Sequence, residues 1–179
     1  MARLPYVNAD EASEPVAEAL RAMPAKVGIV QLIAHAETCL RPFLRLGQAI
    51  LTAQQLDPAL RELAILRTAQ LSGAEYEAVQ HERIALQVGV TAEQVEAVRA
   101  GRIDGPEFTE LQRSVLALTT EVVAGDVDDD TFDAVSLPPR ETMELILAIG
   151  FYLMLGRVMN AVQVDLEPAA EVEVAQLRR

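Results

Sequence analysis

Residues 57–81 read DPALRELAILRTAQLSGAEYEAVQH, and this stretch predicts two helices joined by a sharp turn. Asp57 and Pro58 favour a helix start, because an aspartate side chain accepts hydrogen bonds from the first free amides and proline suits the first helical position. Apolar residues then recur at helical spacing until Gly73 interrupts them, and a second helix follows from residue 74 to about residue 88. We therefore expect a helix hairpin at the centre of the fold.

Helical patterns continue on both sides of this hairpin, and no stretch alternates with a period of two for long enough to predict a strand. The other expected helices cover residues 14–23 and 27–36, a segment that Pro42 begins, a segment that the Thr91–Gln94 capping box begins, residues 107–124, a short segment capped by Asp128 or Asp129, and residues 140–162. The chain is thus predicted to be a single all-α domain over residues 1–179, with its hairpin core at about 57–101 and a frayed tail at 165–179.

The composition indicates one globular core without a membrane span. The chain has 179 residues, of which 51% are hydrophobic, and a chain of this size buries roughly 70% of its extended surface in one core. The longest uninterrupted apolar run covers residues 145–156, whereas a membrane-spanning helix needs about 20 residues. The N-terminus lacks the apolar stretch of a secretion signal, and the single cysteine, Cys39, cannot form an internal disulfide. We therefore expect a cytoplasmic location and no membrane partner.

The charge balance excludes another class of partner. Fifteen lysines and arginines oppose 27 aspartates and glutamates, which gives a formal net charge of −12. A nucleic-acid-binding protein normally carries a basic stripe that displaces counterions from phosphates, and the arginines of this chain are scattered. We therefore expect no nucleic-acid partner.

Only two histidines, His35 and His81, are present to act as a neutral-pH base or as a metal ligand. His81 follows Glu77 by four residues, so both side chains project from one face of the second helix of the hairpin. If the two helices are antiparallel, Glu62 on the first helix approaches His81, and two carboxylates then flank one imidazole. His35 and Glu37 have no third ligand at metal-site spacing, so we expect no metal site.

Ordinary structural roles compete with these functional interpretations. A Glu–His pair four residues apart is common on solvated helix faces and stabilises a helix by only a few tenths of a kcal/mol. Three polar residues, Tyr152, Arg157 and Asn160, interrupt the very apolar helix at 140–162, and they could line a pocket or fix a subunit interface; we favour the structural role. That helix has almost no polar face, so we expect it to be buried at the domain centre or against another subunit.

The residues from Glu62 to His81 resemble the carboxymuconolactone decarboxylase family, whose relatives include the alkyl hydroperoxidase D proteins. The resemblance lies in the segments RELAILR (61–67), GAEYE (73–77) and QH (80–81), and it extends loosely over most of the chain. In the peroxidase branch, a glutamate is followed by a cysteine twelve residues later, a second cysteine three further and a histidine four beyond that. The glutamate and the histidine match Glu62 and His81, but Ala74 and Glu77 stand where the two cysteines would be. The decarboxylase branch instead has a glutamate four residues before its histidine, as Glu77 and His81 are.

This departure bears on the chemistry that the resemblance implies. Peroxide reduction in the family needs one thiolate to attack the peroxide and a second thiol to resolve it, so we disfavour a peroxiredoxin-type activity. Cys39 has no partner cysteine, and we expect it to be simply buried. The resemblance implies an all-helical fold around a helix hairpin, like that of alkyl hydroperoxidase D, assembled as dimers, trimers or hexamers.

Our leading hypothesis is a cofactor-independent lyase or isomerase-type enzyme that acts on a small carboxylated or lactone substrate. His81 would be the acid–base group, Glu77 would carry a proton or orient the ring, and Glu62 would fix the tautomer. Tyr76 is a candidate donor to a developing enolate, and Arg67 or Arg83 would bind the carboxylate of an anionic substrate. The rival hypothesis is a non-catalytic oligomeric scaffold that binds a small ligand.

Overall fold

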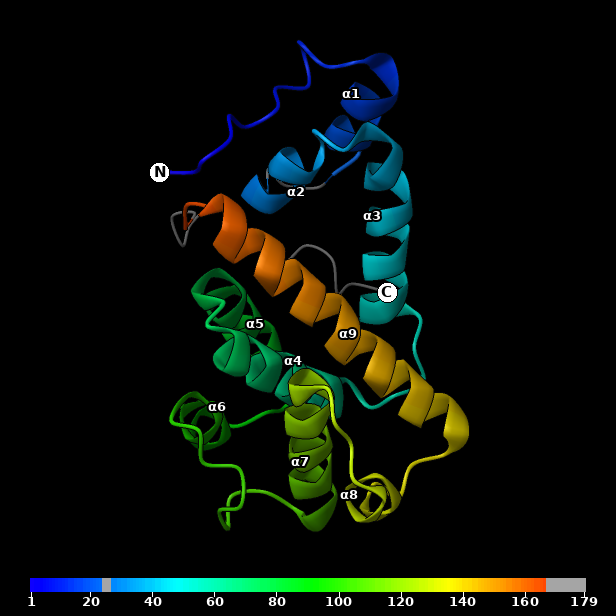
Figure 1. Ribbon diagram of the computed structural model, residues 1–179, viewed down its shortest axis with the longest axis vertical. Coiled ribbons are helices and arrows are strands. Elements are labelled where there is room, and N and C mark those ends of the chain that lie inside the picture. Colours follow the sequence, from blue (N-terminus) through cyan, green and yellow to red (C-terminus); the bar gives the residue numbers. More distant parts are fainter. Residues whose placement is uncertain (24–26, 167–179) are drawn as a thin grey trace. The chain divides into compact units, whose positions relative to one another are not determined.

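The computed structural model describes residues 1–23 and 27–166, and within these ranges the chain forms nine helices and no strand (Figure 1). The prediction of an all-α fold is confirmed. The helices are α1 (Glu14–Arg21), α2 (Gly28–Ile33), α3 (Glu37–Thr52), α4 (Pro58–Ser72), α5 (Glu75–Gln87), α6 (Ala92–Arg99), α7 (Glu110–Ala124), α8 (Asp129–Ala134) and α9 (Pro139–Val162).

The described helices fall into two compact units. Met1–Ala53 and the residues from Met159 onward form the first unit, and Gln54–Val158 form the second. The predicted hairpin core at 57–101 lies wholly in the second unit. The single domain over residues 1–179 stays a prediction, and the predicted tail at 165–179 lies, from residue 167 on, outside the described residues.

The predicted hairpin is present as α4 and α5, and its ends have the expected causes. The Asp57 carboxylate accepts hydrogen bonds from the amides of Ala59 and Leu60 at 2.8 and 3.1 Å, so it satisfies two amides that the helix itself leaves free. Gly73 ends α4 with a φ of 64°, in the left-handed region where residues with a Cβ are strained. The chain can therefore reverse within two residues and begin α5.

Helix α4 is the central element of the second unit, and this explains its burial on all sides. It packs against α5, α6 and α7, and eleven of its residues are buried. One apolar cluster joins α4 to α7 and α9, and another joins α4 to α5, α6 and α7. Polar side chains on α4 are consequently forced into the interior, where each needs a partner.

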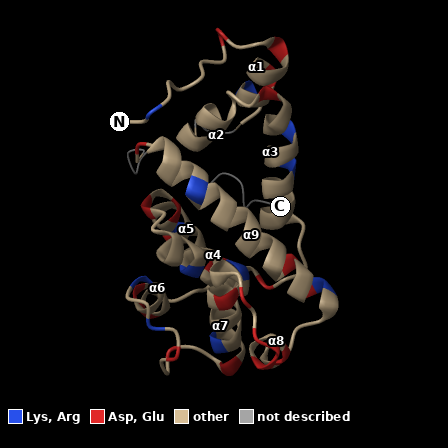
Figure 2. Ribbon diagram, viewed as in Figure 1, with Lys and Arg blue, Asp and Glu red and all other residues tan. Residues whose placement is uncertain are grey.

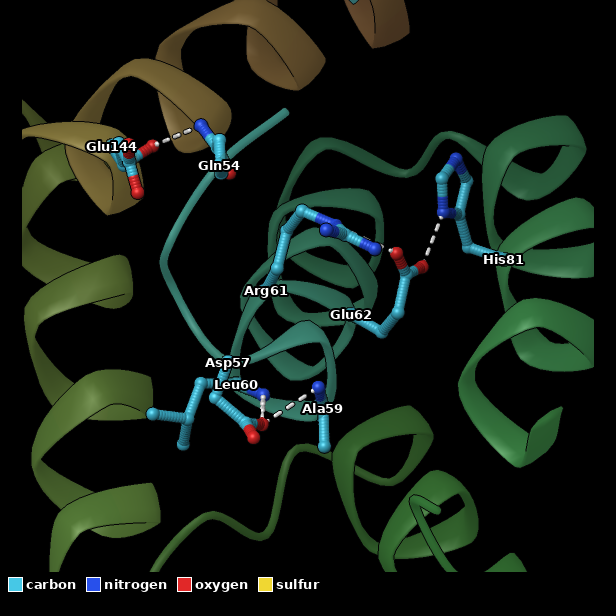
Figure 3. A network of polar contacts seen from close by, with 8 residues as sticks. All are labelled: Gln54, Asp57, Ala59, Leu60, Arg61, Glu62, His81 and Glu144. Carbon is cyan, nitrogen blue, oxygen red and sulfur yellow. Dashed lines mark hydrogen bonds and ion pairs between the residues drawn. The ribbon is translucent and has the colours of Figure 1, made fainter. Parts of the chain in front are cut away.

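Helix α9 also fixes the segment that leads into α4. The Glu144 carboxylate accepts hydrogen bonds from the amides of Gln55 and Leu56 at 2.7 and 2.9 Å. The Gln54 side chain donates to the Glu144 carbonyl at 3.1 Å, as Figure 3 shows. These contacts set where α4 begins relative to α9 within the second unit.

Two predicted helix starts are wrong. Pro42 lies inside α3 and does not begin it, because the Ala36 carbonyl already accepts hydrogen bonds from the amides of Cys39 and Leu40. Helix α7 begins at Glu110 and not near residue 107, because Thr109 and Gln112 form a reciprocal capping box. The other capping box, at Thr91, is confirmed.

In the first unit, the N-terminal segment pairs with the end of α9. The Arg3 amide donates to the Val162 carbonyl at 2.8 Å, and the Tyr6 hydroxyl bonds to the Asp165 carboxylate at 3.1 Å. His35 is exposed and bonds to the Pro5 carbonyl through Nε2 at 2.8 Å. The expectation of a buried Cys39 is wrong, because this side chain is exposed on α3.

Helix α9 is only partly buried among the described residues, and its burial against another subunit stays a prediction. After its first turns, α9 has one charged residue, Arg157, and Figure 2 shows a single blue segment on that part of the helix. Leu145 and Ile149 are fully buried, whereas four apolar side chains on the same helix are exposed: Met143, Leu147, Met154 and Val158. By length and composition alone α9 could also cross a membrane, although the core helix of a soluble protein passes the same test. The uninterrupted apolar run in the sequence is therefore shorter than the apolar helix that the structure shows.

Candidate active site

The hairpin brings Glu62 of α4 against His81 of α5, as the antiparallel arrangement predicts. His81 Nδ1 lies 2.7 Å from Glu62 Oε2, and the two residues are 7% and 0% exposed. A carboxylate accepts, so Nδ1 carries the hydrogen and Nε2 is left as the free basic nitrogen. Figure 3 shows this second nitrogen turned away from Glu62. The pair is therefore an oriented imidazole and not a solvated surface contact.

Arg61, the residue before Glu62, supplies the charge that keeps this carboxylate compensated. Its Nε donates to Glu62 Oε1 at 3.1 Å, and Arg61 is only 3% exposed. A buried carboxylate without a partner is strongly unfavourable, whereas a hydrogen-bonded ion pair recovers much of the desolvation cost. Glu62 thus uses one oxygen for the guanidinium and the other for the imidazole (Figure 3).

Glu77 is a buried carboxyl group of a different kind. It is 1% exposed in the first turn of α5, and neither of its oxygens has a hydrogen-bond partner among the described residues. Burial raises the pKa of Glu77 well above its ordinary value of 4.5, because desolvation disfavours the charged form. Burial therefore favours the protonated form of this group, whose two oxygens have no hydrogen-bond partner in the described part of the chain.

Two residues of α9 complete the surroundings of Glu77 and His81. The Tyr152 ring lies edge-on against the His81 ring, with centroids 4.7 Å apart and an interplanar angle of 83°. A Cβ on Gly156 would lie 3.1 Å from Glu77 Oε2, so α9 approaches the start of α5 closely at this glycine. Burial raises the pKa of the Tyr152 hydroxyl well above its ordinary value, and the negative charges of Glu62 and Glu77 act in the same direction.

The structure brings together some of the predicted site residues and separates others. Glu62 and His81 are in contact, and Glu77 lies buried one turn before His81 on α5. The aromatic ring against His81 belongs to Tyr152 and not to Tyr76, which is buried in the first turn of α5. The sequence shows Tyr152 as a polar residue within an apolar helix, but no local pattern predicts that it contacts His81.

The two arginines predicted to bind substrate do not join this group. Arg67 Nε donates to Thr120 of α7 at 3.1 Å, and its Nη1 donates to Gln70 at 2.7 Å. Burial lowers the pKa of the Arg67 guanidinium. Arg83 is half-buried on α5. The cation found beside Glu62 is Arg61, which the sequence reasoning had used only as part of a family segment.

Other features of the second unit lie apart from this group. A cavity of about 270 Å³ opens between α4, α5 and α6, next to the Gly73 turn, and its lining includes Glu75 and Arg99 but none of Glu62, Glu77 and His81. Residues 1–23 and 27–166 contain no group of three or more potential ligands that could hold a metal ion.

The described residues thus form an all-helical protein whose hairpin buries a paired glutamate and histidine. Residues 38–126 match the model of the carboxymuconolactone decarboxylase family. This part of the chain therefore belongs to that family. No curated protein matches the sequence at a significant level.

Solved structures with the same fold have names that point to different chemistries. A peroxidase-related protein from Silicibacter sp. TM1040 has a TM-score of 0.79 at 15% identity, covering 95% of this chain and 93% of its own. An alkylhydroperoxidase AhpD core protein from Ralstonia eutropha JMP134 has a TM-score of 0.77 at 16% identity, with 93% and 92% covered. A cysteine-to-alanine variant of the debrominase Bmp8, in complex with 2,3,4-tribromopyrrole, has a TM-score of 0.74 at 18% identity, with 94% and 95% covered. At these identities the likeness establishes the fold alone.

Proposed function

We propose that the chain is a cofactor-independent enzyme that moves protons on a small carboxylated or lactone substrate, as a lyase or an isomerase. The observation that supports this most directly is the buried 2.7 Å contact between Glu62 and His81, because it leaves Nε2 of the ring as a base of fixed orientation. Glu77 lies one helical turn before His81 on the same helix, and burial raises the pKa of Glu77, which favours the protonated form that an acid needs. A base and an acid in opposite protonation states at one pH are what proton transfer to and from carbon requires.

These groups suit two related reactions. In an isomerisation, His81 Nε2 takes a proton from the carbon next to a carbonyl, and Glu77 returns one to another carbon of the resulting enolate. In a decarboxylation, the bond to the carboxylate breaks, carbon dioxide leaves, and the electron pair moves into the adjacent carbonyl to form an enolate. Glu77 then protonates the carbon and regains its proton from solvent. Each positioned acid or base is worth roughly 10²–10⁴ in rate.

The test is a turnover assay on 4-carboxymuconolactone and a panel of β-keto acids and lactones, following both carbon dioxide and the organic product. We expect H81A and E77Q each to lower kcat/KM by roughly 10²–10⁴ while folding survives. H35A is the matched control, because His35 is the other histidine of the chain and lies in the first unit. Equal turnover by wild type and H81A would contradict the proposal.

A non-catalytic ligand-binding scaffold is the alternative of another class. It is favoured if the wild type neither turns over any substrate nor exchanges the α-protons of substrate analogues with deuterated solvent. A thiol-based peroxidase activity, by contrast, would have to disappear in C39S, because Cys39 is the only cysteine of the chain. Ala74 and Glu77 stand at the two positions where the peroxidase branch has its cysteines, which argues against that chemistry at the Glu62–His81 pair.

We also propose that copies of the chain assemble with one another through α9. Met143, Leu147, Met154 and Val158 are between 36% and 56% exposed on this helix, and a row of exposed apolar side chains is typical of a contact surface. Light scattering after size-exclusion chromatography should give a multiple of 19.5 kDa for the wild type and a smaller mass for L147D. A monomeric wild type would contradict the proposed assembly.

A further inference from the structure

The Arg61 guanidinium has unused hydrogen-bond donors in a buried place. Its Nε is bonded to Glu62, and within the described residues no acceptor contacts either of its terminal nitrogens, Nη1 and Nη2. Neither nitrogen is among the fully buried polar atoms that lack a partner, so both keep some contact with solvent, whereas a buried arginine more usually bonds to protein acceptors. Arg67, on the same helix and also buried, shows the usual arrangement, with both Nε and Nη1 bonded to side-chain oxygens.

Both partners of the Glu62 carboxylate keep some exposed surface. The Arg61 and His81 side chains keep 4% and 9% of their surface exposed, whereas Glu62 keeps none. A ligand can therefore contact Arg61 and His81, but not Glu62. The Tyr152 ring of α9 lies edge-on to His81, with the ring centroids 4.7 Å apart.

The charges of Arg61, Glu62 and Glu77 indicate what kind of molecule binds beside them. Arg61 and Glu62 form an ion pair, and burial raises the pKa of Glu77, so a further negative charge on Glu77 is disfavoured. Two terminal nitrogens of a guanidinium form a planar fork that matches the two oxygens of a carboxylate. Arg67 and Arg83 do not compete for this role, because Arg67 is turned toward α7 and Arg83 is not among the contacts of Glu62.

We propose that Arg61 is the anion-binding residue of the site: its Nη1 and Nη2 hold a carboxylate of the substrate while its Nε holds Glu62. This inference rests on the proposed function for the identity of the reacting groups and narrows the substrate class to small molecules that carry a carboxylate. A carboxylate held on Arg61 presents its adjacent carbon to His81. Arg61 therefore has two tasks, pairing with the buried Glu62 and selecting an anionic substrate.

The experiment measures binding of a probe that has no reaction to undergo. Saturated 5-oxotetrahydrofuran-2-carboxylate and its neutral carboxamide are titrated into wild type, R61K and R67K by calorimetry. A charge-assisted hydrogen bond contributes about 1.5–3 kcal/mol, and every 1.4 kcal/mol is a factor of ten. We expect R61K to bind the carboxylate roughly 10–100-fold more weakly, because lysine keeps the charge beside Glu62 but lacks the fork. R67K should bind it within twofold of wild type.

The carboxamide separates the anion site from general affinity for the ring. Wild type should bind it more weakly than the carboxylate, and R61K should bind it as wild type does. Equal affinity of wild type for both probes, no carboxylate binding by wild type at millimolar concentration, or an unchanged carboxylate affinity in R61K would each overturn the proposal. The comparison of probes on wild type needs no variant, so it decides the matter even if R61K does not fold.

Failure of this inference is distinguishable from failure of the proposed function. H81A should still bind the carboxylate, because His81 does not hold it. Carboxylate binding that R61K loses, together with an absence of turnover in every assay, keeps the anion site and removes the proposed reaction. Turnover that H81A loses and R61K keeps with an unchanged KM removes the anion site and keeps the reaction.

Discussion

Substituting Gly156 with alanine tests the closest approach of α9 to the hairpin. A Cβ at this position would lie 3.0 Å from the Ala74 Cβ, 3.1 Å from Ser72 Oγ and 3.1 Å from Glu77 Oε2. All three neighbours are buried, so none can move aside into solvent. Gly150 lies on the same helix and has no atom within 4 Å of its own ideal Cβ position, which makes G150A a matched control.

The magnitude follows from two opposing terms. Replacing glycine by alanine inside a helix stabilises it by about 0.8–1.0 kcal/mol, and this term acts in both variants. Overpacking of a close contact costs typically about 1–3 kcal/mol, and this term acts only at Gly156. We therefore expect G150A to raise the free energy of unfolding by about 1 kcal/mol. The difference between the two variants should equal the overpacking term, about 1–3 kcal/mol.

The assay is urea unfolding of wild type and both variants, followed by circular dichroism at 222 nm because the chain has no tryptophan. The dependence of the free energy on urea concentration should be the same in all three proteins, so that a shift in midpoint reports stability alone. If G156A is as stable as G150A, Gly156 does not pack closely against the turn between α4 and α5. That result would also contradict the close approach of α9 to Glu77.

Three further predictions concern single carboxylates. Because the pKa of Glu77 is raised in the folded state, this group favours folding below its ordinary pKa of 4.5, and that contribution is lost as the pH rises through the folded value. Urea titrations from pH 4 to pH 9 should therefore show a decrease in the free energy of unfolding of wild type that E77Q lacks. Parallel pH dependence of the two proteins would refute this prediction. D57A removes the cap of α4 and should cost about 1 kcal/mol in the same titration, whereas no measurable change would show that water replaces the cap. E62Q leaves Arg61 buried without its counter-charge and should cost about 3–5 kcal/mol, and a cost below 1 kcal/mol would mean that Arg61 reaches solvent.

Much of the hairpin could be predicted because its determinants are local. Asp57, Gly73 and the Thr91 capping box each act on amides or backbone angles within a few residues, so the sequence pattern contains their whole cause. The contact between Glu62 and His81 follows from the same information, because a tight turn between two helices fixes which positions meet.

The remaining features depend on packing that no local pattern contains. Tyr152 meets His81 only because α9 crosses the hairpin. Arg61 is adjacent to Glu62 in the sequence, but only the packing of other helices around α4 buries this pair and places Thr120 of α7 against Arg67. We expected the Cys39 side chain to be buried because free cysteines usually are, but the orientation of α3 leaves it exposed to solvent.

The two partners of Glu62 respond differently when the hairpin moves. Arg61 is its neighbour in sequence, so that ion pair travels with α4 as a single piece, whereas the bond to His81 joins two helices and is cut by any separation of α4 from α5. A transient opening therefore never strands an uncompensated charge in the interior. What it releases is the imidazole alone, which becomes free to rotate and to exchange its proton with water, and closure of the two helices restores its orientation.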